Sequence, residues 1–220
     1  MSDKIKSSYK TSKNIYDDII THNTWWSRLY NKVFWNDVND NDIARSLLMH
    51  IPSAFSGKLL DVPVGTAVFT CQKYQSLPKA DITCLDYSED MLAQARTRFK
   101  ANDIQNIKTI QGDVGDLPFE DNHFDIVLSM NGFHVFPDKK RAFQETRRVL
   151  KSGGKFLACF YIRDRSKISD TLVKYILAPK GWFTPPFETS ASLKTYLNKH
   201  YEIESYEVRG SIVIFSAIKR

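Results

Sequence analysis

The sequence predicts an α/β fold in which a doubly wound, mostly parallel sheet of seven strands ends in an antiparallel hairpin. From Lys58 onward, short apolar runs alternate with helical segments of about 10–15 residues, the pattern of parallel strands joined by crossover helices. Later in the sequence, two segments with the residue alternation of β-strands, Tyr201–Val208 and Ser211–Ile218, are separated by only Arg209 and Gly210. So short a connection requires the two runs to pair antiparallel.

Five apolar runs of strand length account for the parallel part of the sheet. They are Lys58–Val62, Asp81–Asp86, Ile107–Gln111, Phe124–Met130 and Lys155–Ile162. With the two strands of the hairpin they make up the seven strands.

Helices are expected between these strands. The first covers Thr66–Tyr74 and follows the first strand closely. The second covers Glu89–Lys100 and begins after Ser88, a favourable N-cap residue. The third covers Lys139–Leu150 and is stopped by the glycine-rich segment Ser152–Gly154.

Two segments decorate what we interpret as a single domain. Residues 1–56 are polar and aromatic with a helical pattern toward their end, and form an N-terminal helical cap. Residues 57–162 form the ligand-binding core. Residues 163–188 contain three prolines and a glycine, too irregular for a further strand and helix, and form a cap insertion. Residues 189–220 supply a helix and the hairpin.

The composition excludes several classes of protein. A chain of 220 residues with 42% hydrophobic and 25% charged residues can bury a full core without disulfides or a metal. Cys71, Cys84 and Cys159 are odd in number and lack CxxC spacing, so we expect free thiols and no metal site. No apolar run approaches the ~18 residues of a membrane span. The opening MSDKIKSSYKTSKN lacks the apolar core of a signal peptide, so we expect a cytoplasmic protein. We expect the protein to be a monomer or a homodimer.

The net charge of +6 is moderate but unevenly distributed. Residues 139–174 contain eleven Lys and Arg against three Asp and Glu, a local excess of +8. Such a window could attract nucleic acid or an anionic substrate. Lysine-rich solvated faces are common beside a sheet, and this second interpretation is favoured here.

The first strand-to-helix turn is the most informative motif, because ligands of such sheets bind over the carboxyl ends of the strands. It contains Asp61, Val62, Pro63, Gly65 and Thr66. Gly65 lets a ligand approach the backbone closely. A turn that binds a dinucleotide pyrophosphate would have GxGxxG spacing. This turn carries a carboxylate and a proline instead, so a cationic ligand suits it better.

Two further acidic residues close the neighbouring strands. Asp86 ends the second strand, twenty-one residues after Gly65, where it can accept hydrogen bonds from both hydroxyls of a ribose. Asp113 follows the third strand and can accept from an adenine amino group, while the N–H of Val114 serves a ring nitrogen. Its place directly after the strand favours Asp113 over the nearby Asp116. The three acids would bracket one elongated ligand.

Five motifs within residues 58–162 occur in a fixed order: LLDVPVGT, CLDYSEDML, GDVGDLPF, FDIVLSMNGFH and RRVLKSGGKF. In this order they resemble class I S-adenosylmethionine-dependent methyltransferases, in the small-molecule branch that includes the quinone-biosynthesis methyltransferases. The resemblance covers roughly half the chain and implies a Rossmann-like fold with S-adenosyl-L-methionine as the cofactor.

The resemblance also implies a role for each matching residue. The methionine end of the cofactor would lie against Asp61 and the turn through Thr66, and Asn131 would lie along the methionine. The remaining residues would contact the nucleoside. Asp86 would bind the ribose, Tyr87 and Met91 would pack against the nucleoside, and Asp113 and Val114 would read the adenine.

Two positions depart from the family, which usually has glycine where this chain has Pro63 and Ala67. Ala67 is small and is expected to open the following helix without penalty. Pro63 has no N–H and a φ fixed at about −65°, so any family contact from that amide is absent. This departure points to weaker binding of the cofactor.

His134 lies just past the fourth strand, where the family places groups that face the methyl acceptor. It is a candidate general base, since an imidazole titrates close to neutral pH. A histidine that packs under the cap is an equally weighted alternative. The tryptophans Trp25, Trp26, Trp35 and Trp182 all fall in the two decorating segments. They either line a pocket for an apolar or aromatic acceptor or pack these segments onto the sheet.

The function expected from these motifs is methyl transfer from S-adenosyl-L-methionine to a small-molecule acceptor, apolar or aromatic, by in-line displacement. DNA adenine and similar acceptors are disfavoured, because no Asp/Asn-Pro-Pro-aromatic motif follows the fourth strand. Three alternatives stay open: an RNA or protein methyltransferase, suggested by the basic window; a cofactor-binding protein with weak or no catalysis, suggested by Pro63; and a nicotinamide-dependent reductase, disfavoured by the missing GxGxxG.

Overall fold

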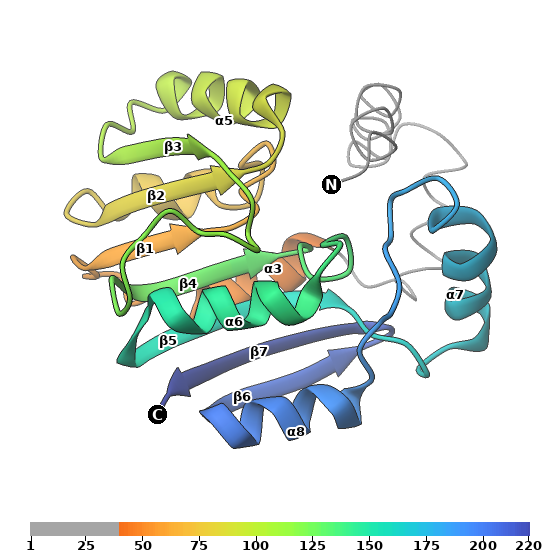
Figure 1. Ribbon diagram of the computed structural model, residues 1–220. Helices are drawn as coiled ribbons and strands as arrows, with labels where there is room; N and C mark the ends of the chain where they lie inside the picture. The colour runs from red at the N-terminus through yellow and green to blue at the C-terminus, as the bar shows by residue number, and fades with distance from the viewer. Residues whose placement is uncertain (1–39) are drawn as a thin grey trace.

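The computed structural model describes residues 40–220, so the predictions for residues 1–39, with Trp25, Trp26 and Trp35, lie outside the described residues. Its centre is a seven-stranded sheet with the strand order β3-β2-β1-β4-β5-β7-β6 (Figure 1). The strands are β1 (Lys58–Asp61), β2 (Asp81–Asp86), β3 (Ile107–Gln111), β4 (Phe124–Met130), β5 (Leu150–Tyr161), β6 (Tyr201–Arg209) and β7 (Ile212–Lys219). Strands β1 to β5 pair in parallel, and β7 pairs antiparallel with β5 and β6. The predicted fold class is confirmed.

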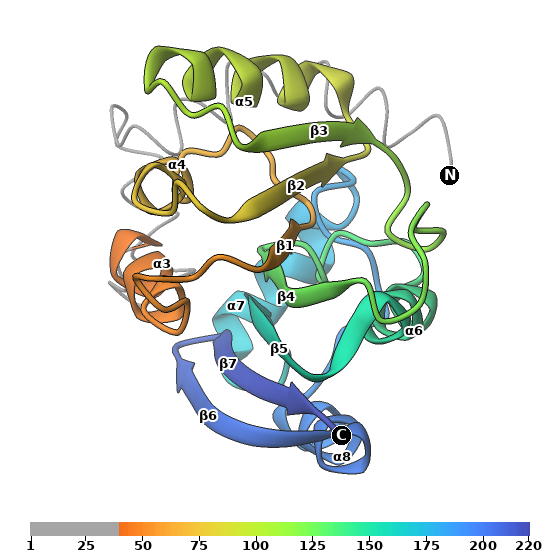
Figure 2. The ribbon, with the colours of Figure 1, turned by 90° about the vertical axis from the view of Figure 1, so that its left-hand side faces the viewer.

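Helices cover both faces of this sheet (Figure 2). On one face lie α3 (Asp40–Leu48), α4 (Cys71–Gln75) and α5 (Glu89–Ala101), and on the other lie α6 (Lys139–Val149) and α8 (Ser190–His200). Successive strand residues point to opposite faces, so Leu59 packs with the first group and Leu60 with the second. Each face thus has its own apolar cluster, as a doubly wound sheet requires.

The start of β5 differs from the prediction. The strand was expected from Lys155, but it begins directly after α6 at Leu150, which pairs with Phe124. The pairing register shifts between Phe124 and Ile126, and Gly153 has a φ of +74°. Glycine tolerates this conformation, so the segment expected to stop a helix is instead an irregular start of a strand.

The first helix begins later than predicted. The sequence favoured Thr66–Tyr74, but α4 begins at Cys71. Gly65 and Ala67 both have a φ of +57°, which is incompatible with a right-handed helix. Val64 and Ala67 are buried in the apolar cluster, and this burial holds the segment as a loop. Ala67 therefore does not open a helix, and its methyl group occupies a conformation that favours glycine.

Residues 163–188 extend beyond the carboxyl ends of the parallel strands (Figure 1). They contain α7 (Lys167–Leu172) and a π-helical turn, η1 (Val173–Leu177). The carboxylate of Asp170 accepts hydrogen bonds from the Tyr161 hydroxyl and from the N–H of Asp164. These contacts attach the insertion to the end of β5. Within residues 40–220, no helix has the length and apolarity needed to cross a bilayer.

Candidate active site

A cavity opens at the carboxyl ends of β1, β2 and β4 and beside the loop after β3. It is bordered by the loop that precedes α4 and by the start of α5. Every residue predicted from the sequence to bind the cofactor lines it: Asp61, Val62, Pro63, Gly65, Thr66, Asp86, Tyr87, Met91, Asp113, Val114 and Asn131. The parallel strands bring these residues together from four separate segments.

Asp61 ends β1 and is 1% exposed at the base of the cavity. One carboxylate oxygen accepts a hydrogen bond of 2.7 Å from the hydroxyl of Tyr74 on α4. Burial, together with the nearby charge of Asp86, raises the pKa of Asp61 to about 7, and the Tyr74 hydrogen bond opposes the rise. The ionised carboxylate is therefore poorly compensated within the protein, and a cationic ligand would stabilise it.

Asp86 ends β2 and holds two loops in place. One carboxylate oxygen accepts from the N–H of Gly65 and the other from the N–H of Ser88, each at 2.8 Å. Burial raises the pKa of Asp86, and these backbone hydrogen bonds oppose the rise. Each carboxylate oxygen can accept a second hydrogen bond, so the group still has lone pairs to offer a ligand.

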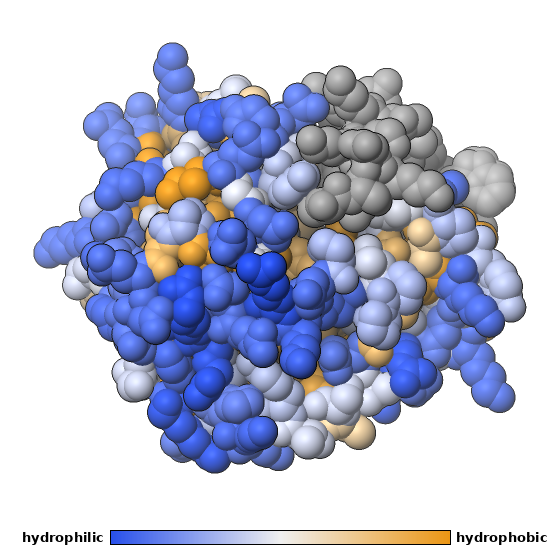
Figure 3. Space-filling view, viewed as in Figure 1, coloured by the Kyte–Doolittle hydropathy of each residue, from blue (hydrophilic) through white to orange (hydrophobic). Residues whose placement is uncertain are grey.

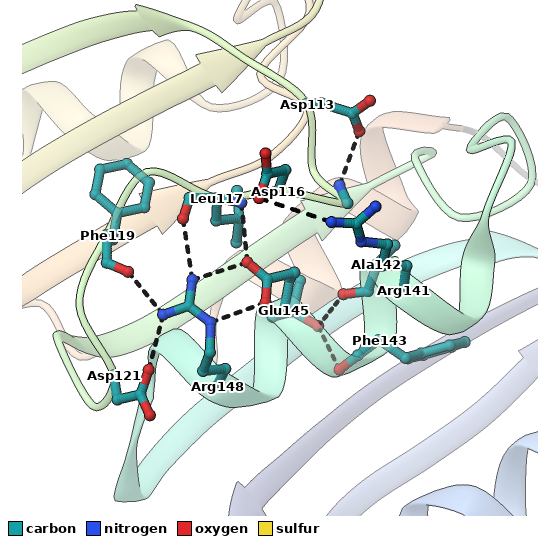
Figure 4. Close-up of polar contacts among 12 residues, drawn as sticks. Asp113, Asp116, Leu117, Phe119, Asp121, Arg141, Ala142, Phe143, Glu145 and Arg148 are labelled. Carbon is teal, nitrogen blue, oxygen red and sulfur yellow. Dashed lines mark hydrogen bonds and ion pairs between the residues drawn. The ribbon is translucent and has the colours of Figure 1, made fainter. Parts of the chain in front are cut away.

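Asp113 and Asp116 lie on the loop after β3 and have different surroundings (Figure 4). Asp113 lines the cavity and accepts a hydrogen bond of 2.8 Å from the N–H of Gly115. Asp116 is outside the cavity lining, has an 86% exposed side chain and forms a 3.8 Å ion pair with Arg141. The structure therefore brings Asp113 to the site and leaves Asp116 on the surface, as the sequence favoured.

Arg148 of α6 fixes the same loop, a role that the sequence did not indicate (Figure 4). Its guanidinium donates to Glu145, to Asp121 and to the carbonyl groups of Leu117 and Phe119. Glu145 in turn accepts from the N–H of Leu117. The one available signal was the i, i+3 spacing of Glu145 and Arg148, which says nothing about the loop they hold.

Pro63 has a close neighbour across the cavity base. A Cβ added to Gly132 would lie 2.4 Å from Cδ of Pro63 and 2.6 Å from the ring of Phe136. Only glycine therefore leaves room for the proline ring at this point. Next to it, Asn131 has a φ of +55° and donates its N–H to the carbonyl of Cys159 at 2.8 Å, which presents residue 131 to the cavity.

His134 is not part of the cavity lining. It is 6% exposed, its ring stacks on Phe183 of the insertion at 4.3 Å, and its Nδ1 accepts the N–H of Tyr161. Burial, helped by the charge of Lys139, lowers the pKa of His134 to about 3, so the ring is neutral. These contacts match packing under the insertion, the alternative to a general base. Phe183 likewise packs inward on Tyr161 at 5.4 Å.

The insertion is bonded to the cavity wall through Thr184. Its N–H donates to the carbonyl of His134 at 2.9 Å, and its hydroxyl donates to the carbonyl of Val135 at 2.8 Å. The ammonium of Lys139 bridges the carbonyls of Phe136 and Thr184. Burial lowers the pKa of Lys139 to about 8. Residues 134 and 135 are thus bonded directly to the insertion, and residue 136 is connected to it through Lys139.

The charged side chains of the cavity lining are all acidic. Within residues 40–220, the lining includes Asp61, Asp86 and Asp113 but no Lys, Arg or His. No group of three or more His, Cys, Asp and Glu among the described residues is arranged to hold a metal ion. Apolar side chains make up much of the remaining wall: Val68, Phe69, Met130, Val135 and Phe136. The site therefore suits a positively charged ligand, and its apolar side chains suit an apolar group bound next to that charge.

Comparisons with known proteins agree with this geometry. Residues 59–154 match a family described as a methyltransferase domain. A demethylmenaquinone methyltransferase of Listeria welshimeri is 40% identical over 102 residues, 46% of this chain and 43% of the relative. The chain thus spans less than half the length of the curated relatives that it matches.

Solved structures share the fold. A provisionally assigned methyltransferase from Bacillus halodurans is 26% identical, with a TM-score of 0.64 over 76% of this chain and 71% of the other. An S-adenosylmethionine-dependent methyltransferase from Aquifex aeolicus is 14% identical, with a TM-score of 0.63 over 93% of this chain and 98% of the other. Residues 59–154 thus match a methyltransferase domain and resemble demethylmenaquinone methyltransferases in sequence, within a fold that the chain shares with S-adenosylmethionine-dependent methyltransferases of known structure.

Proposed function

We propose that this chain transfers a methyl group from S-adenosyl-L-methionine to a small-molecule acceptor by in-line displacement. One observation carries the proposal: the only charged side chains that line the cavity within residues 40–220 are the carboxylates of Asp61, Asp86 and Asp113. Such a site attracts a cation and repels a pyrophosphate. This favours the sulfonium cofactor over a nicotinamide dinucleotide.

The residues present fit this cofactor. The poorly compensated carboxylate of Asp61 suits the ammonium of the methionine end, and Asn131 lines the same cavity. Asp86 retains lone pairs for the ribose hydroxyls, with Tyr87 and Met91 beside it. Asp113 and Val114 suit the adenine. When bound, the cofactor supplies an activated methyl group with its own leaving group.

The protein's own part is then to bind, to orient and to exclude water. The loop before α4, fixed by Asp86 through Gly65, covers one side of the cavity. Val135 and Phe136 form an apolar wall on the other side, which favours an apolar or aromatic acceptor. An acceptor held in line with the methyl group needs little further catalysis, since the donor carries its own leaving group.

His134 contributes to this arrangement as a positioning residue. Its ring is neutral, lies outside the cavity lining and supports Phe183. We infer that His134 holds the insertion against residues 135 and 136 and does not remove a proton from the acceptor. The acceptor named for the Listeria relative, a demethylmenaquinone, belongs to the class of apolar aromatic compounds that this wall favours.

The first experiment measures ligand-induced changes in the melting temperature. S-adenosylmethionine and S-adenosylhomocysteine are expected to raise it, since a ligand at ~100 times its Kd adds about 2.7 kcal/mol, whereas NADH is expected to have no effect. Asp113→Asn should weaken S-adenosylhomocysteine binding, and Asp116→Asn is the matched control that should not. A shift with NADH alone, or equal effects of the two variants, would contradict the proposal.

The second experiment concerns the acceptor. Formation of S-adenosylhomocysteine is measured with a panel of phenols, quinols and anionic small molecules, and the apolar aromatic members are expected to react. Turnover confined to RNA or protein substrates would instead support the macromolecular alternative. Cofactor binding without turnover on any acceptor would support a binding protein with weak or no catalysis.

A further inference from the structure

A second concave site lies on the face of the sheet that carries α6 and α8, and its charge is opposite to that of the cavity. This groove is lined by both helices, by β7 and by the loop near Asp121. The molecular surface on this side is largely hydrophilic (Figure 3). Pro137 lines both the groove and the cavity, so the two sites adjoin at that residue.

Two neighbouring arginines of α6 have different surroundings here. Arg148 is committed to Glu145, Asp121 and two loop carbonyls (Figure 4). Arg147 is exposed and lines the groove, and no hydrogen bond or ion pair joins it to another described residue. The contacts that explain the position of Arg148 therefore do not explain why Arg147 lies in the groove.

Further cations face Arg147 from other elements. Lys199 and His200 lie at the end of α8, and Lys219 lies at the end of β7. Burial, followed by the charges of Arg147 and Lys199, lowers the pKa of His200. Burial, followed by the charge of Arg147, lowers the pKa of Lys219, with Asp121 in partial opposition. The positive groups therefore lie close enough to repel one another.

The acidic residues of the groove are engaged elsewhere. Asp121 forms a 2.8 Å ion pair with Arg148, and Asp138 caps the N-terminus of α6. Glu188 accepts a hydrogen bond from Ser192. Asp121 also attracts Lys219, whose ammonium donates to the Asn122 side chain and to the Leu150 carbonyl. The charges of Arg147 and Lys199 are not neutralised by these carboxylates.

Helix dipoles account for part of this charge. Arg147, Lys199 and His200 lie in the last turns of α6 and α8, where cations are favoured. Each helix end carries the equivalent of roughly half a negative charge, so two ends offset about one of the three full positive charges. A positive surplus remains in the groove.

We propose that this groove binds a small, soluble polyphosphate, a ligand with two or three adjacent phosphoryl groups. The Arg147 fork and the Lys199 ammonium, together with the remaining N–H of Lys219, come from three elements of the groove and match adjacent phosphate oxygens. The acidic cavity would repel the same ligand, so the two sites are chemically distinct. The inference is independent of the proposed methyl transfer.

Calorimetric titration of the full chain with sodium tripolyphosphate tests the proposal. Saturable binding is expected, weaker at 200 mM than at 50 mM salt because exposed charges are screened. Arg147→Gln and Lys199→Gln should each raise the Kd about tenfold, equivalent to roughly 1.4 kcal/mol. Lys174→Gln, which removes an exposed lysine of η1 outside the groove, is the matched control and should leave the Kd unchanged.

Two further measurements complete the test. Saturating S-adenosylhomocysteine should leave the tripolyphosphate Kd unchanged, and the melting temperatures of the variants without ligand should equal that of the wild type. Absence of saturable binding, or equal Kd values for Arg147→Gln and Lys174→Gln, would overturn the proposal. Binding of a ten-nucleotide RNA without binding of tripolyphosphate would also overturn it and would assign the groove to a nucleic acid.

Discussion

The pKa of Asp61 makes a quantitative prediction about cofactor binding. Burial and the neighbouring Asp86 raise this pKa to about 7, and the proposed cofactor contact requires the ionised carboxylate. With a pKa of about 7, roughly a tenth of the sites are ionised at pH 6 and about nine tenths at pH 8. Affinity for S-adenosylhomocysteine should therefore increase about tenfold between these values, or about 1.4 kcal/mol.

The variant Asp61→Asn isolates this effect. Asparagine is nearly isosteric and can still accept the Tyr74 hydrogen bond, but it does not titrate. Calorimetry at pH 6, 7 and 8 should show weaker binding by the variant and a smaller change with pH than in the wild type. Titration of the ligand's own groups is common to both proteins and cancels in the comparison. Parallel pH profiles for the two proteins would refute the reasoning.

The same carboxylate affects the stability of the free protein with a defined sign. Its pKa in the folded state lies above the ordinary value of 3.8, so the folded state binds more protons than the unfolded state between about pH 4 and pH 7. Stability from this group therefore falls as pH rises through that window, by up to about 4 kcal/mol over about three pKa units. In thermal melts, Asp61→Asn should gain stability relative to the wild type at pH 8 and much less at pH 4. A constant difference would contradict this assignment.

Three further predictions concern the cavity walls. Ala67→Gly should raise the free energy of unfolding by about 1 kcal/mol in denaturant titrations, because φ of +57° disfavours a Cβ; a loss of stability would contradict the strain. Gly132→Ala should lower the melting temperature, since its Cβ would lie 2.4 Å from Pro63, and Pro63→Ala in the same chain should restore part of the loss. His134→Phe, which keeps a ring against Phe183, should retain turnover far better than His134→Ala; equal inactivation of both variants would instead indicate a general base.

The strands and the cavity could be predicted because both depend on local signals. Each parallel strand is a short apolar run bounded by polar residues, and acidic residues follow at the points where the strands end. Given parallel strands, their carboxyl ends meet at one edge, so Asp61, Asp86 and Asp113 converge without any knowledge of side-chain packing. The order of the strands then decides which loops border the site.

The differences arose where tertiary contacts override local preference. A helix from Thr66 was reasonable by propensity, but burial of Val64 and Ala67 in the core holds a loop. Arg147 and Arg148 are adjacent and alike in sequence, and only the position of the loop at residues 117–121 separates a structural arginine from an exposed one. The surroundings of His134 likewise depend on Phe183, far along the chain, which no local pattern could connect to it.

Four hydrogen bonds among Thr184, Lys139 and residues 134–136 connect the insertion to one part of the cavity wall. The carboxylates that face the proposed cofactor belong to β1, β2 and the loop after β3, whereas Val135 and Phe136 of the apolar wall are bonded to the insertion directly or through Lys139. Substitutions in residues 163–188 can therefore be transmitted to the acceptor side while the acidic side stays unchanged. Changes in this one segment can therefore alter acceptor preference while the carboxylates that face the proposed cofactor stay the same.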